Sequence, residues 1–529
     1  MKKRLAIIGA GSSGLITLKQ ALDRLPDWEI VCFEKGTTTT GCWGDPYPGF
    51  VSTSTKYTTQ FACYKKWSSR ADPADRSEKG DFFRGDEYGR YLNEFAEHFN
   101  LRKHIQFGAQ VLKIQKVDAG WSLSIEDGSL REECFDKLII CTSLVAKTKN
   151  IDTETPLLSN ADEPPKNSTI LVLGGGESGA DVAHRFAAPL LGNRVFLSLK
   201  NGVRVSPRYH PIRGVPSDFL RNRLMLSIHR DVRNIIGQKF VEARIRHQKK
   251  FEKFFRNRST AAELPDDVSA TRTFWDAKLT AKAKSDLFHV FHTKSDDFLD
   301  DVGAGRISIV GPPSDSSYDT CLDFDQNETI EVNPDFICPM IGFTSGLEGL
   351  SDGKIAVRDF YEGCVHVAHD DLFLIGFARP IIGNIPTISE MQAKYVTRLI
   401  ADECERPTEI ATLHAAAEKR IKNDFGTLNI TAIHPVEMFP YCDRLAREIG
   451  SLPTLKGAGS LRAWIKIQLA PASTTHYIDE DYHQQETSDE CVHSPALITA
   501  LLIMIKTVER PLRWLLCSLS KSGNRHSGS

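Results

Sequence analysis

The sequence predicts an α/β fold with two dinucleotide-binding domains of the Rossmann type, the second inserted into the first. Three observations lead to this prediction: a glycine turn between an apolar strand and a helix near the N-terminus, a second such unit from residue 170, and a hairpin pattern between them. A chain of 529 residues has room for both units and a further segment. Its 41% hydrophobic and 25% charged residues are typical of a soluble globular protein.

Charge and cysteine usage exclude several classes of protein. The formal net charge is −2, so nothing in the overall balance favours a nucleic-acid partner. The 12 cysteines include no C-x-x-C pair, which argues against zinc ribbons and dithiol reductases, and we expect no metal site. We interpret them as reduced thiols of a cytoplasmic protein. The apolar run 495–505 is too short to span a bilayer, which needs about 20 residues.

The first nucleotide-binding unit begins with the apolar run 5–8, continues through a glycine turn and enters a helical pattern. Glycines at three positions of this turn permit its tight bend, the close approach of a pyrophosphate and the packing of helix on strand: Gly9, Gly11 and Gly14. The helix N-terminus then faces the phosphates. The next strand, 30–33, ends at Glu34, where a carboxylate would accept hydrogen bonds from a ribose diol.

The second unit repeats this pattern from residue 170, with glycines at Gly174, Gly176 and Gly179. Its next strand, 195–199, ends at Lys200 and carries no acidic residue at the ribose position. Ser198, Lys200 and Arg204 would suit a 2′-phosphate, which favours NADPH over NADH. The alternative is that these basic residues belong to a solvated loop.

The segment between the units indicates how they are joined. Runs 111–117 and 121–125 flank a glycine turn and predict a hairpin, and 137–141 predicts a further strand. This is the layout of flavoproteins with two dinucleotide sites, one for FAD and one for a nicotinamide cofactor. The predicted FAD-binding domain has a first part over 1–150 and a second part over 306–450. Between them we expect an NADPH-binding domain over 165–305, with a basic helical insertion over 207–300. A C-terminal extension covers 451–529.

At this point the chain resembles the flavin-containing monooxygenase family, with its N-hydroxylating and Baeyer–Villiger relatives, from residue 1 to about 450. Gly41-Cys42-Trp43 is similar to the family's loop beside the flavin, and Thr53-Ser54-Thr55-Lys56 to its Asn-x-Ser-Lys stretch. Residues 335–337 and 342–343 stand where the family has its Ala-Thr-Gly-Tyr strand, and 372–393 resembles the last strand and helix of its FAD domain.

The resemblance implies a set of cofactor-binding residues. Thr387 and Glu390 have capping-box spacing, so we expect a well-formed helix N-terminus there, facing flavin or pyrophosphate. The residues implied for FAD are Gly9, Gly11, Gly14, Glu34, Lys35, Trp43, Pro386 and Thr387. Those implied for NADPH are Gly174, Gly176, Glu177, Ser178, Gly179, Ser198, Lys200 and Arg204.

The chain also departs from the family. Its F-x-G-x-x-x-H fingerprint is missing, Thr53 replaces the family's Asn near the flavin, and Pro339-Met340-Ile341 replaces the Ala-Thr strand. The scaffold and cofactors therefore carry over, while the substrate and the final reaction stay open.

Three functions follow from the resemblance. In the first, NADPH reduces FAD, O2 forms a C4a-hydroperoxyflavin, and one oxygen passes to nitrogen, sulfur or aromatic carbon of a small organic substrate. The second is a single-component flavin-dependent halogenase that oxidises bromide or chloride and acts on a phenol or indole. The third is a non-catalytic flavoprotein that serves as a binding module.

Four residues are candidates for the catalytic chemistry. Thr53 and Lys56 would lie near the reactive flavin edge; the alternative is a capped loop and a solvated lysine. Lys200 and Lys239 are candidates for a lysine that holds an electrophilic halogen.

Two segments carry no motif. Residues 219–258 contain twelve Lys or Arg against three Asp or Glu, which predicts a basic helical insertion that forms a solvated lid over the cofactor cleft. Residues 496–517 predict an amphipathic helix that lies on a membrane surface, packs on the body of the protein or contacts a homodimer partner. We expect a loop over 479–490 and disorder over 521–529.

Overall fold

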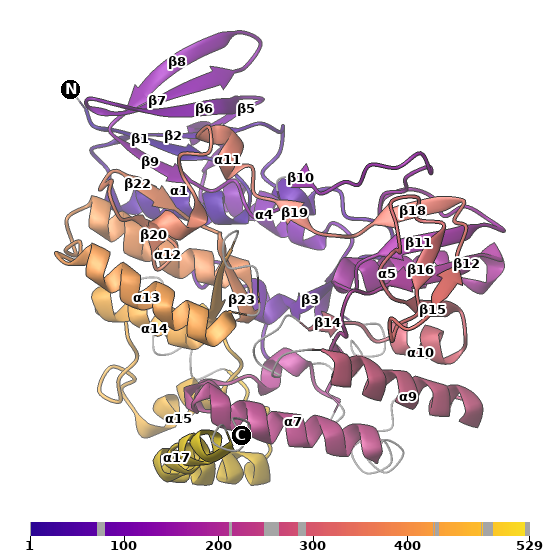
Figure 1. Cartoon of the computed structure of the whole chain (residues 1–529). Coiled ribbons are helices and arrows are strands. Elements are labelled where there is room, and N and C mark those ends of the chain that lie inside the picture. Colours follow the sequence, from indigo (N-terminus) through magenta and orange to yellow (C-terminus); the bar gives the residue numbers. More distant parts are fainter. Residues whose placement is uncertain are drawn as a thin grey trace.

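The computed structural model places two sheet-centred lobes side by side above a layer of helices (Figure 1). The described residues are 2–70, 80–145, 147–210, 214–247, 264–283, 292–426, 428, 433–477, 479 and 490–523, with side chains described as far as 511. Phe251, Phe254 and Phe255 of the basic insertion, most of the predicted loop over 479–490 and the last six residues lie outside them.

The first lobe is built on a seven-stranded sheet with the order β20-β21-β22-β9-β1-β2-β5. Strands β22, β9, β1, β2 and β5 pair in parallel, and apolar side chains on both faces of these strands are buried. One face is covered by three helices and the other by an antiparallel sheet. The strands are β1 (Arg4–Ile8), β2 (Glu29–Glu34), β5 (Ile105–Phe107), β9 (Lys137–Ile140), β20 (Phe360–Tyr361), β21 (Val365–His366) and β22 (Leu372–Leu374). The helices are α1 (Ser12–Arg24), α4 (Glu87–His98) and α12 (Ile385–Ile400).

The antiparallel sheet includes the hairpin that the sequence predicts. Strands β6 (Gln110–Val117) and β7 (Gly120–Glu126) pair with Val117 opposite Gly120, and β8 (Leu130–Phe135) adds the third strand. The buried side chain of Trp121, a residue of β7, donates its indole N–H to Asp371, just before β22, at 2.9 Å. The hairpin is thereby fixed to the first sheet.

The second lobe is a four-stranded parallel sheet with the order β15-β12-β11-β18. Its strands and the helices beside it are β11 (Thr169–Leu173), β12 (Arg194–Ser198), β15 (Ile307–Val310), β18 (Phe336–Pro339), α5 (Glu177–Phe186) and α10 (Phe298–Gly303). Both β15 and β18 follow residue 305, where we expected the second domain to end. The boundary is wrong for these strands, because both complete the parallel sheet around β11 and β12.

Helices of the insertion lie beneath both lobes (Figure 1): α6 (Arg223–Ser227), α7 (Arg230–Arg246) and α9 (Asp266–Lys282). The described part of the insertion is helical, as predicted, and part of it packs against the first lobe instead of lying free in solvent. Arg223, Arg230 and Arg233 form ion pairs with acids of the first lobe: Asp443, Asp424 and Glu437 respectively. Three of its basic residues therefore fix the insertion to the neighbouring lobe.

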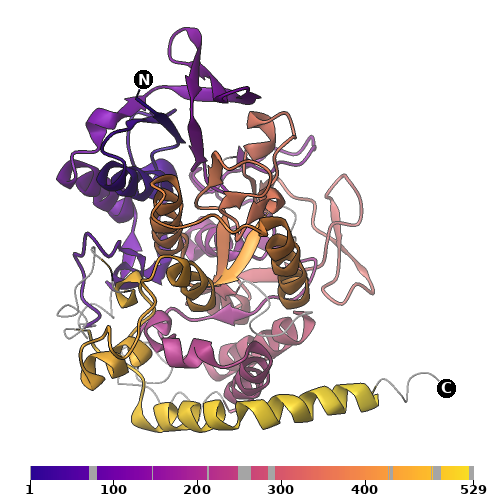
Figure 2. The same cartoon turned by 90° about the vertical axis from the view of Figure 1, so that its left-hand side faces the viewer.

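The C-terminal residues form α15 (Leu461–Leu469) and the long helix α17 (Ala496–Gly523), which runs along the bottom of the molecule (Figure 2). One face of α17 packs on the insertion through Leu502 and Ile505. Its other face exposes Leu497, Leu501 and Met504. In the described part of the chain, no helix has the length and apolar character needed to cross a membrane.

Smaller elements connect these parts. The two-stranded sheets are β3–β4 (Val51–Thr55, Phe82–Arg84), β10–β19 (Lys147–Thr148, Phe343–Thr344), β13–β14 (Val205–Ser206, Thr293–Lys294), β16–β17 (Thr320–Leu322, Thr329–Glu331) and β23–β24 (Ala378–Ile382, His434–Glu437). The remaining α-helices are α2 (Lys56–Thr59), α11 (Leu347–Leu350), α13 (Ile410–Phe425) and α14 (Met438–Glu448). The 3-10 helices are η1 (Gly41–Trp43), η2 (Arg102–His104), η3 (Pro189–Leu191), η4 (Ser217–Leu220), η5 (Val357–Asp359) and η6 (Thr474–His476).

Candidate functional site

The two glycine loops have nearly the same geometry. Gly9 and Gly174 have φ of +97° and +107°, a region that favours glycine. A Cβ on Gly14 would lie 1.8 Å from the carbonyl oxygen of Gly9, and a Cβ on Gly179 would lie 1.9 Å from that of Gly174. Each loop therefore needs glycine at its first position for conformation and at its third position for helix–strand packing.

The helix N-termini behind these loops are open to a phosphate. Gly11 is the N-cap of α1 and Gly176 the N-cap of α5, and no side chain caps either helix. Beyond its own chain neighbours, no protein atom lies within 4 Å of the point where a Cβ of Gly176 would stand. The uncapped N–H groups and the free space beside them fit the pyrophosphate of a dinucleotide.

Residues predicted to bind FAD surround the first loop. The Glu34 carboxylate accepts hydrogen bonds from the backbone N–H groups of Ala10 (2.7 Å) and Gly36 (2.8 Å), so it lies directly at the turn. Trp43 is half-buried and packs edge-on against Tyr88, with ring centroids 5.0 Å apart. Lys35 is exposed. Their roles toward FAD remain predictions.

The three residues predicted to bind a 2′-phosphate lie in different environments. Ser198 is buried and donates its hydroxyl hydrogen to the carbonyl of Gly311 at 2.8 Å. The guanidinium of Arg204 is buried and donates to Gln238 at 2.9 Å. Lys200 is exposed. The preference for NADPH at this position therefore rests most directly on Lys200.

Glu177 is the first residue of α5 and lies within the second glycine loop, and Ser178 follows it half-buried. Burial raises the pKa of Glu177 to about 7, although Lys294, Arg208 and Arg379 oppose this by favouring the carboxylate. A carboxyl group with a pKa near neutrality therefore lies where the second lobe meets the first.

The turn that resembles the flavin-edge loop consists of β3 and α2. Thr53 is half-buried within β3. Lys56 begins α2 and its ammonium lies 3.1 Å from Glu87. Thr55 is the N-cap of α2, so this turn does contain the capped loop that we weighed against a catalytic role.

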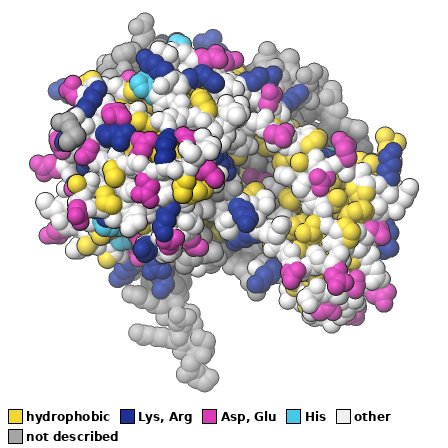
Figure 3. All heavy atoms as spheres, turned by 90° about the horizontal axis from the view of Figure 1, so that it is seen from above, with side chains coloured by type: hydrophobic (Ala, Val, Ile, Leu, Met, Phe, Trp, Pro, Cys, Tyr) yellow, Lys and Arg dark blue, Asp and Glu magenta, His cyan; other side chains and the backbone are white. Residues whose placement is uncertain are grey.

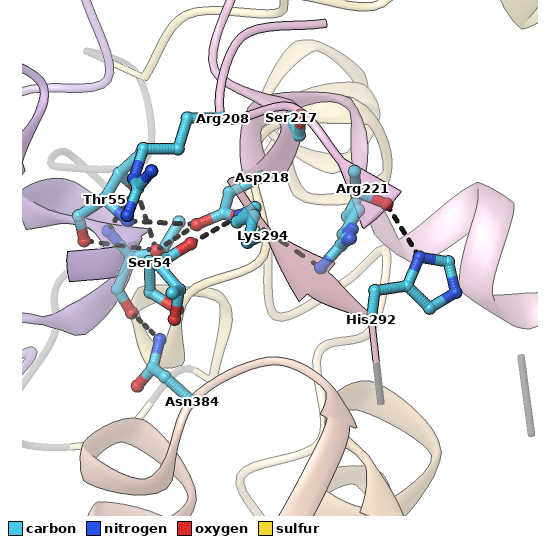
Figure 4. A network of polar contacts seen from close by, with 12 residues as sticks. Ser54, Thr55, Arg208, Ser217, Asp218, Arg221, His292, Lys294 and Asn384 are labelled. Atoms are coloured by element: carbon cyan, nitrogen blue, oxygen red, sulfur yellow. Dashed lines mark hydrogen bonds and ion pairs between the residues drawn. The ribbon is translucent and has the colours of Figure 1, made fainter. Parts of the chain in front are cut away.

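A buried ion pair holds this turn from the side of the second lobe (Figure 4). The Lys294 ammonium lies 2.7 Å from Asp218 Oδ1 and also donates to the carbonyl of Thr53. Asp218 Oδ2 accepts the backbone N–H of Thr55 at 2.9 Å. Burial lowers the pKa of Lys294, against the opposing effect of Asp218. Burial alone would raise the pKa of Asp218, but Lys294 and Arg221 lower it below its ordinary value.

Arg208 holds the start of the same strand. Its guanidinium donates to the carbonyls of Val51 (2.8 Å) and Ser52 (3.1 Å), and only 2% of the residue is exposed. A cavity of about 580 Å³ lies beside it, and its lining includes Tyr47 and Asp181, whose side chains are joined by a 2.7 Å hydrogen bond. Seen from above, the surface is hollowed between the two lobes (Figure 3).

The helix α12 begins one residue earlier than Pro386, and its cap differs from our expectation. Asn384, rather than Thr387, is the N-cap, and its side chain accepts the N–H of Thr387 at 3.1 Å. Asn384 also donates to the carbonyl of Thr58 at 2.7 Å, which ties α12 to α2 (Figure 4). Glu390 is buried and accepts the N–H of Ala62 instead of completing a capping box.

The sequence did not point to Asp218, Lys294, Arg208 or Asn384. Each partner of the Thr53–Thr58 turn comes from a distant part of the chain; Thr55 and Asp218, for example, are 163 positions apart. No local pattern marks a lone Asp or Lys as buried. In contrast, Lys239 has 74% of its side chain exposed and pairs with Glu242 on the surface of α7.

Comparison with known proteins identifies the family of the chain. The family model described as flavin-binding monooxygenase-like matches residues 2–271. The 4-hydroxybenzoate brominase (decarboxylating) of Marinomonas mediterranea is 24% identical over 481 residues, covering 86% of this chain and 85% of its own. The N-oxide-forming dimethylaniline monooxygenase 4 of Mus musculus is 24% identical over 494 residues, covering 86% and 80%.

Solved structures show the same fold. The S-allyl-L-cysteine S-oxygenase of Allium sativum superposes with a TM-score of 0.55 at 15% identity, covering 85% of this chain and 89% of its own. An open structure of cyclohexanone monooxygenase gives a TM-score of 0.56 at 15% identity, covering 84% and 97%.

The fold and the paired loops thus define a flavoprotein with two dinucleotide-binding domains. The chain belongs to the flavin-binding monooxygenase-like family. This confirms the predicted fold class, an oxidoreductase, and the cofactors FAD and NADPH.

Proposed function

We propose that this protein binds FAD at the first glycine loop and NADPH at the second, and uses O2 to oxygenate a small organic substrate. The observation that carries this proposal is the pair of matched loops, whose helices α1 and α5 both begin at a glycine with no capping side chain. The Thr53–Thr58 turn is fixed from both lobes by Lys294 and Asn384. A rigid turn at this position would orient the substrate and the reacting edge of the cofactor.

The bound flavin supplies the hydride acceptance and O2 activation that side chains cannot provide. The protein contributes binding, orientation and charge. Gly9, Gly11 and Gly14 hold the first dinucleotide, and Gly174, Gly176 and Gly179 the second. Lys294 presents a buried cation beside Thr53, and Glu177 is a carboxyl group that can take up or release a proton near neutral pH.

Halogenation is the second candidate function, because two of the relatives are brominases and because Lys294 is buried at the turn. In this alternative, oxidation of bromide at the bound flavin would supply hypobromous acid. The Lys294 ammonium gives a proton to Asp218, and the resulting amine attacks hypobromous acid, which forms an N–Br bond and releases water. The bromine then passes to an electron-rich aromatic carbon, which loses a proton, and the amine is restored. Burial favours the neutral amine that this step needs. Lys294 replaces Lys200 and Lys239 as the lysine we favour.

We also propose an aromatic substrate, which both oxidative reactions would accept. The exposed face of α17 is the surface for the proposed contact with a membrane or a homodimer partner. Vesicle co-sedimentation and analytical ultracentrifugation test these two contacts. The third function, a binding module without turnover, is disfavoured because both loops keep every glycine that their geometry requires.

The experiment that tests the function follows NADPH oxidation by the purified, FAD-loaded protein with phenolic and indole acids, with and without bromide. Mass spectrometry identifies the products. A gain of one oxygen regardless of halide supports oxygenation, whereas a bromine isotope pattern that requires added bromide supports halogenation. If no flavin co-purifies and no NADPH is consumed with any substrate, the enzymatic proposal fails.

A further inference from the structure

Two adjacent residues of β14, Thr293 and Lys294, contact the two cofactor sites from one short strand. The hydroxyl of Thr293 donates to the carbonyl oxygen of Gly175 at 2.6 Å. Gly175 stands between Gly174 and Gly176 in the NADPH loop. Lys294, the next residue, donates to the carbonyl of Thr53 in the turn at the predicted flavin edge.

The strand between these contacts is held firmly. The residues of β14 pair in parallel with β13, and Thr293 N–H donates to the carbonyl of Arg204 at 2.9 Å. Thr293 is 3% exposed and Lys294 5% exposed. Successive side chains of a strand point to opposite faces, which explains how neighbouring residues reach different lobes.

The Lys294 side chain is also held in place by Asp218. Asp218 joins Lys294 at 2.7 Å and holds the Thr55 N–H at 2.9 Å through its other oxygen. A movement of Lys294 therefore acts on the turn at two places, the carbonyl of Thr53 and the N–H of Thr55 (Figure 4). Close packing transmits such a movement because the surrounding core leaves little space to absorb it.

We propose that Thr293 and Lys294 are positioning residues that couple occupancy of the NADPH loop to the conformation of the Thr53–Thr58 turn. A dinucleotide that binds the uncapped N–H groups at Gly176 fixes the peptide planes of the loop, including the Gly175 carbonyl. The Thr293 hydroxyl transmits this constraint to β14, and the Lys294 ammonium transmits it to the turn. This inference rests on the proposed NADPH site.

The test uses hydrogen–deuterium exchange of the FAD-loaded protein, with and without saturating NADP⁺. In the wild type, NADP⁺ slows exchange both in the loop 174–179 and in the turn 51–59, the latter by about fivefold or more. Thr293→Val removes only the hydroxyl donor. In this variant NADP⁺ still protects the loop, but protection of the turn falls below about twofold. The double variant Lys294→Met/Asp218→Asn removes the contact with Thr53 without leaving an unpaired buried charge, and it gives the same pattern.

Two variants control for general damage. Thr293→Ser keeps a hydroxyl and retains protection of the turn. Thr397→Val removes a comparable buried hydroxyl, which donates to the Ala393 carbonyl at 2.8 Å within α12, and also leaves the coupling intact. Loss of coupling in Thr293→Ser or Thr397→Val overturns the inference, as does full coupling in Thr293→Val.

Hydrogen exchange of the wild-type protein distinguishes failure of this inference from failure of the proposed NADPH site. Protection of loop 174–179 without protection of turn 51–59 overturns the coupling and leaves the NADPH site standing. Protection of neither segment overturns both.

Discussion

Arg233 on α7 and Glu437 on β24 form an ion pair of 2.5 Å with only 4% and 8% of their side chains exposed. Arg233 also donates to the carbonyl of Ile228 at 2.9 Å, so the guanidinium is held from both sides. The pair joins the helical insertion to the first lobe. With Arg223–Asp443 and Arg230–Asp424, it fixes in place a segment whose composition suggests a solvated surface.

Removing one member of this pair should destabilise the protein strongly. Arg233→Met leaves Glu437 buried without its cation, and the expected cost is about 3–5 kcal/mol of unfolding free energy. The double variant Arg233→Met/Glu437→Gln should cost less than the single one, since no uncompensated charge remains. Urea unfolding of the four proteins in a double-mutant cycle measures the coupling. Additive costs would show that the pair contributes no interaction of its own.

The glycine loops predict a selective loss of each cofactor. Because a Cβ on Gly14 or Gly179 would meet a backbone carbonyl at under 2 Å, alanine at either position must displace its loop. Gly14→Ala should lose bound FAD, while Gly179→Ala should keep FAD and bind NADPH at least about tenfold more weakly, a loss of 1.4 kcal/mol. Flavin absorbance and NADPH titration measure the two effects.

Gly176→Ala and Gly349→Ala complete this series. Both positions have free space for a methyl group, so neither variant should lose stability through a clash. Gly176→Ala should nevertheless weaken NADPH binding, because the methyl group would occupy the space beside the α5 N-terminus. Gly349→Ala on α11 should bind both cofactors normally. Equal NADPH affinity in Gly176→Ala and Gly349→Ala would contradict the assignment of the loop.

The side chain of Asn384 forms hydrogen bonds with both the Thr387 N–H and the Thr58 carbonyl, and two substitutions should distinguish their effects. Asn384→Ala loses the cap of α12 and the bond to Thr58, so we expect a loss of about 1–2 kcal/mol in unfolding free energy. Asn384→Asp keeps an acceptor for the Thr387 N–H but loses the amide donor to the Thr58 carbonyl. It should retain most of the helix stability and loosen α2, seen as faster hydrogen exchange over residues 56–59. Equal hydrogen exchange over residues 56–59 in the wild type and Asn384→Asp would show that the Asn384–Thr58 hydrogen bond does not hold α2 in place.

How far the sequence alone predicts this molecule depends on the range of the interactions involved. The glycine loops were predictable because strand, turn and helix are contiguous and their geometry demands glycine at fixed spacing. The hairpin at 110–126 was predictable for the same reason. The cap at Asn384 was missed because Thr387 and Glu390 offered an equally local pattern, and Glu390 is instead used by a distant backbone N–H at Ala62.

The Asp218–Lys294 pair shows where prediction from sequence stops. Its members are 76 positions apart and both lie in the insertion, which carries no motif. Their burial depends on how the insertion packs against β3, which no local periodicity encodes. The end of the second sheet was misplaced for a similar reason, since β15 and β18 join it by pairing with strands more than a hundred residues earlier in the chain.

Glu177 should make stability depend on pH. Its pKa rises from 4.5 to about 7 on folding because of burial, so the folded state binds a proton more tightly than the unfolded state. The favourable contribution is complete below pH 4.5 and is lost as the pH rises through 7. Glu177→Gln removes this dependence, so relative to the wild type it should gain up to about 3 kcal/mol between pH 4.5 and 8. Urea unfolding across this range provides the measurement, with Glu97→Gln on the exposed surface of α4 as the control. A constant difference between Glu177→Gln and the wild type would show that Glu177 titrates normally.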